Sequence, residues 1–380
     1  MDRTLNILYL TVKGLRLTSS QQLGLYVRRF SNEAFRCDVA TYKPLDDADE
    51  LRRLGVGLHR VRGLREWRRP DAILMRPLTL RALSRIVRER SIHVVHTFQT
   101  SSAPYGLALS ARTGVPHIAQ VRNTYDAAAH YVRFGLHKAE ILLMLSDSMM
   151  QHYRTLVNGH ARADQRQVVI PNGIDIEAYE KRASERNIRA ELGIGKGVPV
   201  VGLVGALSER KDTLLAVEVA ARVRARQPAV RFIFVGGWSD ESWRARVMAR
   251  VGELDLAGVC HFAGYQEEAA PWYRAMDLLL HTALREGHPK VFNEAMVFSL
   301  PVVSSRITGS RDVVDEGVTG LLCEPGDAEE FSGAVCSLLE SEPLRRRMGA
   351  AGRLRVSQHY SARSSLDRLA ELYRDVAARH

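Results

Sequence analysis

The sequence of 380 residues has few cysteines and no long hydrophobic run, and each shortage excludes a class of protein. Its four cysteines, Cys37, Cys260, Cys323 and Cys336, lie far apart in apolar contexts, so we expect buried thiols and neither a disulfide framework nor a metal site. The apolar run 141–145 is far shorter than the ~18–20 residues that span a bilayer. The 13 prolines and 28 glycines are too few for a collagen-like or low-complexity chain. The remaining class is an ordinary globular protein of about two domains.

Acidic side chains are scarce in the first half of the chain. Residues 1–170 contain 26 lysines and arginines against 14 acids, whereas residues 171–380 contain 28 against 29. The excess is concentrated in residues 52–90, here called the basic segment, which contains twelve arginines and three acids. Such a surface would attract an anionic membrane or an acidic acceptor, although solvated helix faces are an equal alternative. Nucleic acid is not expected, because Trp67 is the one Trp, Tyr or Phe residue of the segment that could stack on a base.

The start of the chain shows no targeting signal. Residues 1–3 lead directly into a short hydrophobic stretch without a small-residue cleavage site. We therefore expect a cytoplasmic protein, which would be peripheral at the inner membrane surface if the basic segment binds lipid.

Short β-branched runs alternate with stretches of helical periodicity along the whole chain. This alternation is typical of parallel sheets with crossover helices, so we expect an α/β fold with two doubly wound domains facing across a cleft. In the first half we expect strands at Leu5–Leu10, Val39–Tyr42, His93–His96, His117–Val121, Ile141–Leu145 and Val168–Ile170, with helices such as Gln21–Phe30 and Thr79–Glu89. In the second half we expect strands at Val198–Val204, Arg231–Val235, Val259–Phe262, Leu278–Leu280, Pro301–Ser304 and Gly320–Cys323.

A turn at Pro171-Asn172-Gly173, followed by the polar stretch 177–196, marks the expected domain boundary. We place it after Asp175, which gives domains 1–175 and 176–360. The last stretch, 361–378, is predicted to be an amphipathic helix that needs a surface to cover. Its apolar stripe consists of Leu366, Leu369, Leu372 and Val376.

The most informative stretch runs from Glu286 to Met296, directly after an expected strand. A Gly-His-Pro entry suits a loop that turns into a helix at Pro289 or Lys290, and the free N–H groups of a helix start suit a phosphate. Glu286 would stand just before this helix and Glu294 about one turn inside it. Both carboxylates could then accept hydrogen bonds from hydroxyls of one ligand. Two isolated glutamates at this spacing are usually solvated, so the interpretation depends on the rest of the sequence.

Together with four other stretches, this segment resembles the retaining glycosyltransferases of family 4, which have the GT-B fold of two Rossmann-like domains. The five stretches are 170–175; 204–207 with 211–212; 262–265; 286–296; and 300–303 with 317–322 and 325–327. They occur in the family's order over nearly the whole chain. The resemblance implies a donor-binding domain, 176–360, for a nucleotide-diphosphate sugar and an acceptor-binding domain, 1–175. It also implies that the final helix, 361–380, crosses back to the acceptor-binding domain.

The resemblance assigns roles to residues of the donor side. Glu286 looks like the carboxylate that holds the donor sugar hydroxyls, Glu294 like the one that holds the ribose, and Lys211 like the lysine that faces the diphosphate. A cation there would stabilise the charge that develops on the leaving diphosphate. The other donor-binding residues that the resemblance implies are Gly205, Arg210, Tyr265 beside the nucleobase, Gly287, His288, Pro289, and the backbone of Lys290 and Val291.

Three positions depart from the family pattern. Many members have an arginine where this chain has Ala206, so one charge of the diphosphate clamp is missing unless Arg210 replaces it. Arg122 stands where a loop histidine is expected. It cannot act as a base, and it could bind the leaving phosphate, which is the role we favour, or an anion of the acceptor. The first loop lacks paired glycines, and the acceptor-side candidates are Gly14, Ser19, Ser20, His96, Arg122 and Asn123, although a lone histidine at a strand end, as His96 is, is more often structural.

We therefore expect a hexosyl- or N-acetylhexosaminyltransferase that uses a nucleotide-diphosphate sugar, with a UDP-sugar favoured, and retains the α configuration without a metal or other cofactor. The resemblance implies a front-face mechanism, in which the leaving diphosphate accepts the acceptor's proton, so Glu286, Lys211 and Arg122 are the catalytic candidates and no nucleophile is named. The product would belong to glycan, glycolipid or natural-product biosynthesis. The departures leave an alternative, a non-catalytic sugar-nucleotide-binding or scaffold subunit. An epimerase or phosphorylase on the same fold is a further one, although no pyridoxal lysine motif is found.

Overall fold

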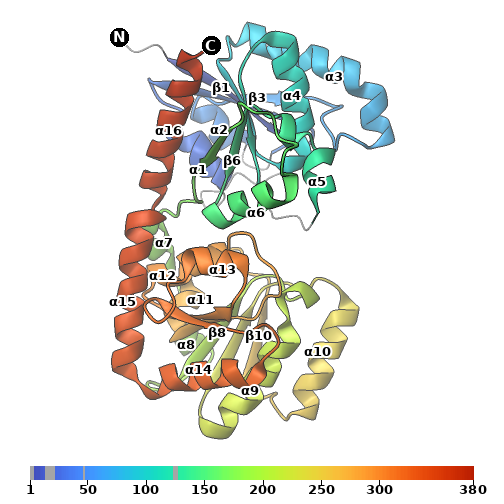
Figure 1. Cartoon of the computed structure of the whole chain (residues 1–380). Coiled ribbons are helices and arrows are strands. Elements are labelled where there is room, and N and C mark those ends of the chain that lie inside the picture. Colours follow the sequence, from blue (N-terminus) through green and yellow to red (C-terminus); the bar gives the residue numbers. More distant parts are fainter. Residues whose placement is uncertain (1–3, 13–21, 46–47, 123–126) are drawn as a thin grey trace. The chain divides into compact units, whose positions relative to one another are not determined.

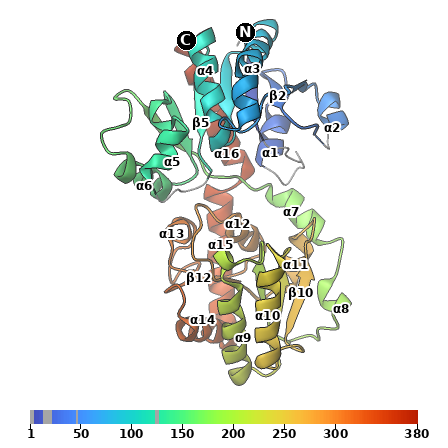
Figure 2. The ribbon, with the colours of Figure 1, turned by 90° about the vertical axis from the view of Figure 1, so that its right-hand side faces the viewer.

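The structure is a computed structural model that describes residues 4–12, 22–45, 48–122 and 127–380. The chain divides into two compact units, drawn in Figures 1 and 2. The first unit contains residues 1–173 and 362–380, and the second unit contains residues 174–361. The predicted acceptor-side residues Gly14, Ser19, Ser20 and Asn123 lie outside the described residues.

The first unit is built on a seven-stranded parallel sheet with the order β3-β2-β1-β4-β5-β6-β7. Its strands are β1 (Leu5–Thr11), β2 (Phe35–Thr41), β3 (Gly57–Arg60), β4 (Val94–Thr97), β5 (His117–Gln120), β6 (Ile141–Met144) and β7 (Arg166–Val169). Its helices are α1 (Gln22–Arg29), α2 (Ala48–Arg53), α3 (Pro70–Glu89), η1 (Thr100–Ser102), α4 (Ala103–Thr113), α5 (Ala128–Arg133), η2 (Leu136–Lys138), α6 (Asp147–Val157) and α16 (Ala362–Ala378).

Both faces of the first sheet are buried, which explains why its strands read as continuous apolar runs. In β1, Ile7 and Tyr9 pack on one face with side chains of α1 and α16, whereas Leu8 and Leu10 pack on the other with side chains of α3. Figure 1 shows α16 lying along this sheet, although the helix is the last element of the chain. The predicted return of the final helix to the first unit is therefore confirmed.

The second unit is built on a six-stranded parallel sheet with the order β10-β9-β8-β11-β12-β13. Its strands are β8 (Val200–Val204), β9 (Arg231–Val235), β10 (Cys260–Gly264), β11 (Leu278–His281), β12 (Val302–Ser305) and β13 (Gly320–Cys323). Its helices are α7 (Ile176–Ala183), α8 (Ile188–Glu191), η3 (Glu209–Lys211), α9 (Thr213–Arg226), α10 (Glu241–Glu253), α11 (Ala270–Ala275), α12 (Lys290–Val297), α13 (Thr308–Val313), α14 (Ala328–Glu340) and α15 (Glu342–His359). Figure 2 shows α9 and α10 side by side over one face of the sheet.

The expected fold class is confirmed, and the differences lie at element ends. β2 begins at Phe35, four positions before the predicted start, and β3 was not predicted at all. α3 begins at Pro70 rather than Thr79, because proline suits a helix start and the exposed Ile73 and Leu74 hide the helical periodicity. All four cysteines are free and buried, as expected. None of the helices in the described ranges combines the length and the hydropathy that a membrane span needs.

Candidate functional site

Two loops at the carboxyl edge of the second sheet contain the residues that sequence analysis singled out. One loop follows β8 and contains η3, and the other follows β11 and leads into α12. β8 and β11 are adjacent strands, and they mark the point where the strand order reverses. In doubly wound sheets, ligands bind outside the carboxyl ends of the strands at this point.

Lys211 is fixed by hydrogen bonds of its own backbone. Its N–H donates to Ser208 Oγ over 3.4 Å, and its carbonyl accepts from Thr282 Oγ1 over 2.9 Å. The next residue, Asp212, has a φ of 46° and caps α9 by accepting a hydrogen bond from Leu215 N–H over 3.2 Å. The lysine is 8% exposed, so the two loops place its ammonium group at a defined, nearly buried position.

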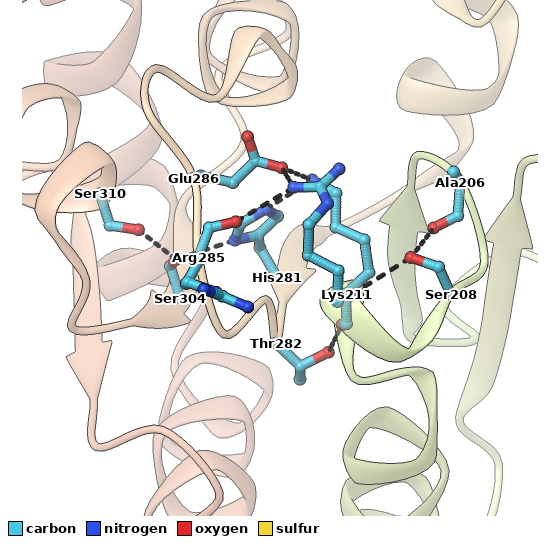
Figure 3. Close-up of polar contacts among 10 residues, drawn as sticks. Ala206, Ser208, Lys211, His281, Thr282, Arg285, Glu286, Ser304 and Ser310 are labelled. Atoms are coloured by element: carbon cyan, nitrogen blue, oxygen red, sulfur yellow. Dashed lines mark hydrogen bonds and ion pairs between the residues drawn. The ribbon is translucent and has the colours of Figure 1, made fainter. Parts of the chain in front are cut away.

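Three charged side chains converge beside this position, as Figure 3 shows. Lys211 Nζ lies 2.5 Å from Glu286 Oε1, and Arg210 Nη1 lies 2.6 Å from the same oxygen. The Arg210 guanidinium also donates to the carbonyl of Arg285 over 3.0 Å. Arg210 therefore points to the same carboxylate as Lys211, which was uncertain from sequence because adjacent residues often point apart. The cluster carries two positive charges and one negative charge.

Burial and charge act in opposite directions on these groups. Burial lowers the pKa of Lys211, and the Glu286 carboxylate opposes that shift. Burial alone would raise the pKa of Glu286, but the ammonium of Lys211 and then the guanidinium of Arg210 bring it below its ordinary value. Glu286 is therefore ionised at neutral pH, and its carboxylate can accept hydrogen bonds from hydroxyls.

A histidine lies behind the lysine. Lys211 Nζ is 3.1 Å from His281 Nε2, and because an ammonium group only donates, this nitrogen must be the acceptor. Nδ1 then carries the proton and donates to Ser304 Oγ over 3.2 Å, and Ser304 in turn lies 2.9 Å from Ser310 Oγ. Burial, with the nearby Lys211 and Arg210 charges, lowers the pKa of His281 well below its usual value. The ring is therefore neutral and positions the ammonium of Lys211.

Backbone at the carboxyl edge leaves no room for larger residues. Gly205 and Gly236 have φ values of 135° and 153°, and a Cβ on Gly236 would lie 1.8 Å from the carbonyl oxygen of Gly205. A Cβ on Gly309 would lie 2.6 Å from the carbonyl oxygen of Glu286. Glycine at these positions lets the loops that follow β8 and β9 approach each other and lets α13 approach the loop that carries Glu286.

Glu294 is the fifth of the eight residues of α12, about one turn inside the helix, whose start at Lys290 agrees with the predicted one. Its Oε2 accepts a hydrogen bond from the Tyr273 hydroxyl over 2.8 Å, and its Oε1 lies 3.0 Å from Lys290 Nζ. Burial, and then the Glu294 carboxylate, raise the pKa of Tyr273 well above its ordinary value, so that hydroxyl remains a donor. Glu294 is 7% exposed and its carboxylate has a fixed orientation.

The remaining donor-side candidates have different environments. Tyr265 is 73% exposed and follows β10, where its Cβ lies 3.6 Å from the position that a Cβ on Gly237 would take. Gly287 and Pro289 lead into α12, and Val291 is half-buried in its first turn. His288 is buried, with its ring centroid 5.6 Å from that of Tyr360.

The first unit holds the acceptor-side candidates. Arg122, directly after β5, donates to Asn172 Oδ1 over 3.3 Å and lies 4.4 Å above the centre of the Phe98 ring. His96, in β4, is fully buried, and its Nδ1 lies 2.6 Å from the hydroxyl of Tyr373 in α16. This burial favours the structural role for His96.

Sequence reasoning missed the residues that support the predicted ones. Neither His281 nor Tyr273 was named, and Asn172 was quoted only as part of a turn. The one signal for His281 was a polar residue that ends the apolar run of β11 just before the Glu286 loop. Tyr273 had none, because the contact with Glu294 joins two helices that are separate in sequence.

The chain matches two known families. Residues 184–355 match the glycosyl transferases group 1 family, and residues 20–173 match the glycosyl transferase 4-like domain. Among curated proteins, it is 25% identical over 245 residues to N-acetyl-alpha-D-glucosaminyl L-malate synthase of Bacillus anthracis, which covers 64% of this chain and 62% of that protein. It is 30% identical over 298 residues to D-inositol 3-phosphate glycosyltransferase of Rhodococcus opacus, and this match covers 76% of this chain and 64% of that protein. The matched region thus spans less than two thirds of the length of these relatives.

Solved structures share the fold over the full chain. The structure of Anabaena Alr3699/HepE in complex with UDP and glucose superimposes with a TM-score of 0.81 at 19% identity, covering 98% of this chain and 100% of that one. Sucrose-phosphate synthase from Thermosynechococcus elongatus superimposes with a TM-score of 0.79 at 20% identity, covering 99% and 100%.

Proposed function

The chain belongs to the group 1 glycosyltransferases, which have the GT-B fold, and from this premise we propose that it transfers a sugar from a nucleotide-diphosphate donor to an acceptor. We propose in addition that the transfer retains the α configuration, needs no metal, and moves a hexose or an N-acetylhexosamine from a UDP-sugar. The UDP and glucose in the Anabaena relative support this choice of donor.

The observation that carries the proposal is the convergence of Lys211 and Arg210 on Glu286 at the carboxyl edge of the second sheet. When a glycosidic bond to a diphosphate breaks, negative charge develops on the leaving oxygen. A nearly buried lysine and a half-exposed arginine, both held by Glu286, stabilise that charge more than they stabilise the ground state, and they supply the charge that a metal ion supplies elsewhere. Arg210 thereby takes the role of the arginine that is absent at position 206.

In this proposal the two carboxylates bind different parts of the donor. Glu286, ionised and beside the cations, accepts hydrogen bonds from hydroxyls of the transferred sugar. Glu294, oriented by Tyr273 and Lys290, accepts hydrogen bonds from the ribose. The backbone N–H groups at the start of α12 donate to the diphosphate, and Tyr265 stacks on the nucleobase.

In the proposed mechanism the leaving diphosphate remains on the face of the sugar that the acceptor attacks. Its oxygen accepts the proton of the acceptor hydroxyl while the acceptor oxygen bonds to the anomeric carbon and the bond to the diphosphate breaks. The products are the α-linked glycoside and the nucleoside diphosphate. No side chain forms a covalent intermediate.

A donor panel followed by a turnover assay tests the proposal. UDP-, ADP-, GDP- and TDP-sugars are compared by thermal shift, where a donor at a hundredfold excess over its Kd stabilises the protein by ~2.7 kcal/mol. The stabilising donor is then incubated with candidate acceptors, and release of the nucleoside diphosphate and the anomeric configuration of the product are measured. Lys211→Met should lose both responses, whereas Arg244→Ala, an exposed residue of α10, should lose neither.

The same assay distinguishes the alternative of a non-catalytic sugar-nucleotide-binding or scaffold subunit. Such a subunit would be stabilised by a donor, and the Lys211→Met variant would not, but neither hydrolysis nor transfer would exceed the rate without protein. Slow hydrolysis of the donor that is lost in Lys211→Met would contradict the scaffold alternative.

We further propose that the basic segment docks on an anionic membrane surface. Ile73, Leu74 and Leu78 of α3 are 50%, 81% and 55% exposed. Leu74 and Leu78 share one face of the helix with three exposed arginines, Arg81, Arg85 and Arg88, because these positions recur every three or four residues. Among the described residues these three arginines form no ion pair. Apolar side chains beside free cations suit the boundary between acyl chains and anionic headgroups.

A further inference from the structure

The first sheet has its own point of reversal. From β1 the chain runs outward through β2 and β3, and it then returns to β4 on the other side of β1. Ligands of doubly wound sheets bind beyond the carboxyl ends of the strands at such a point. Phe98 follows β4 there, and Arg122 follows the neighbouring strand β5.

Arg122 carries a charge that the described part of the chain does not compensate. No carboxylate of the described residues forms an ion pair with its guanidinium. Its contacts are the amide oxygen of Asn172, at 3.3 Å, and the face of the Phe98 ring, at 4.4 Å from the ring centre. Arg90 in the same unit shows the contrasting case, because its guanidinium lies 2.9 Å from the buried carboxylate of Asp38.

The other groups that face Arg122 are uncharged. The Tyr26 hydroxyl lies near the guanidinium, and Gln120 Nε2 donates to that hydroxyl over 3.3 Å. Burial, and to a lesser degree the charges of His117 and Arg122, lower the pKa of His96 to about 3, so this ring is neutral. Burial also lowers the pKa of the Arg122 guanidinium itself. A cation held among neutral groups costs folding free energy unless an anion joins it.

Weakly paired polar atoms occur in the same cluster. Gln22 Nε2, Gln120 Oε1 and His96 Nε2 are buried without a hydrogen bond of good geometry among the described residues, while Gln22 interacts with Tyr26 and Gln120 with His96. All three side chains belong to the group around Tyr26 and His96. Buried polar atoms are nearly always well paired in folded proteins, so a cluster of weakly paired ones beside a cation without a carboxylate partner has hydrogen-bonding capacity left for a ligand.

We propose that Arg122 forms an anion-binding site of the first unit and that the anion it binds is a phosphate or carboxylate group of the acceptor. A guanidinium donates two parallel hydrogen bonds to either group, and the Phe98 ring holds its plane in place. The donor diphosphate has cations of its own in the second unit, Lys211 and Arg210. The assignment of the anion to an acceptor rests on the proposed function. The existence of an anion site at Arg122 does not.

The first experiment measures the anion site without any turnover. Binding of inorganic phosphate and of acetate is titrated by calorimetry or NMR at constant ionic strength, with UDP present at saturation so that the donor side is occupied. We expect wild-type protein to bind one anion and Arg122→Gln to bind it at least tenfold more weakly. Arg112→Gln, an exposed arginine of α4 in the same unit, is the matched control and should bind like wild type. Equal binding by wild type and Arg122→Gln would overturn the proposal.

The second experiment separates the two sources of the anion. Acceptors are compared in matched sets: a polyol, its phosphomonoester and a hydroxy acid of similar size. If the anion belongs to the acceptor, Arg122→Gln raises the KM of the anionic acceptors at least tenfold and changes kcat and the Kd of UDP by less than threefold. In Arg122→Lys the KM of the anionic acceptors lies between those of wild type and Arg122→Gln. If Arg122 instead faces the leaving diphosphate, kcat falls and UDP binds more weakly at unchanged acceptor KM, and the proposal is wrong.

The failure of this inference can be distinguished from failure of the proposed function. Transfer to neutral acceptors only, with no effect of Arg122→Gln on any acceptor KM, would overturn the acceptor site and leave glycosyl transfer intact. An anion titration that depends on Arg122, in a protein that transfers no sugar from any donor, would support the anion site and contradict the proposed activity.

Discussion

At the scale of single residues, the decisive feature is one carboxylate oxygen that two cations share. Glu286 Oε1 lies within 2.6 Å of both Lys211 Nζ and Arg210 Nη1. The carboxylate therefore keeps the two cations side by side when no donor is bound. In the proposed donor complex, the diphosphate would compete for the same cations and release the carboxylate toward the sugar hydroxyls. Under this proposal Glu286 has two tasks: it orders the cations without a donor, and it would bind the transferred sugar when a donor is present.

Glu286→Gln separates these two tasks, because the amide keeps the shape but loses the charge. We expect kcat to fall by about a hundredfold, a typical effect of removing one polar contact to a transition state. The Kd of UDP should stay within threefold, because UDP lacks the transferred sugar that Glu286 is proposed to hold. The measurement is turnover together with UDP calorimetry, and Glu241→Gln on the exposed side of α10 serves as control. A loss of UDP affinity as large as the loss of kcat would contradict the assignment of Glu286 to the transferred sugar.

Glu294→Ala should weaken the nucleotide itself. Its removal leaves the ribose hydroxyls and the Tyr273 hydroxyl without their acceptor, which costs ~1–3 kcal/mol, or about five- to 150-fold in the Kd of UDP. Tyr273→Phe removes only one of the groups that orient the carboxylate, so its effect on the Kd should be smaller and of the same sign. Unchanged UDP binding in Glu294→Ala, in a variant with normal unfolding, speaks against a ribose contact.

At the scale of elements, α3 combines a buried face with an outer face of leucine and arginine. We expect the protein to bind vesicles that contain anionic lipid and to bind neutral vesicles much more weakly. Binding should fall steeply between low and physiological salt, because the Debye length shortens from about 30 Å at 0.01 M to about 8 Å at 0.15 M. Leu74→Gln with Leu78→Gln should reduce binding at every salt concentration, whereas Arg81→Gln with Arg85→Gln should reduce chiefly its salt dependence. Equal binding of wild type and both double variants would remove the membrane surface from the proposal.

The limits of prediction from sequence are also clearest at this scale. β9 and β13 agree with their predicted ranges residue for residue, because a strand buried on both faces must be apolar throughout. β3 was missed because its four residues, Gly57–Arg60, are half-buried or exposed and form no continuous apolar run. The Glu286 loop could be found from its motif. The support that His281 and Tyr273 give it depends on packing between distant elements, and no local pattern encodes that.

At the scale of the whole molecule, neutral histidines inside both units make stability depend on pH. Burial lowers the pKa of His96 and of His117 to about 3, and that of His281 well below its usual value. In the unfolded chain these rings take up protons near pH 6.5, whereas in the folded chain they do so only at much lower pH. Stability is therefore full above pH 7 and is lost as pH falls below about 6.5.

Between pH 7.5 and pH 5, each such histidine should remove about 2 kcal/mol from the free energy of unfolding of its unit. Urea unfolding at the two pH values measures this loss. In His117→Gln the loss of unfolding free energy of the first unit should be smaller by about that amount. The control is His152→Gln, since His152 is a half-buried residue of α6. A free energy of unfolding that is the same at both pH values would contradict the neutral buried rings.

The position of α16 has a consequence for synthesis. The seven strands of the first unit leave the ribosome first, but α16, which packs on Ile7 and Tyr9 together with α1, leaves only after the whole of the second unit. The second unit is continuous in the chain and can fold as it emerges, whereas one side of the first sheet is covered only in part, by α1, until α16 emerges. Tyr373 then closes that side by joining the hydroxyl of Tyr9 and the ring of His96. Emergence of α16, rather than emergence of the first 173 residues, is thus the event that completes the first unit.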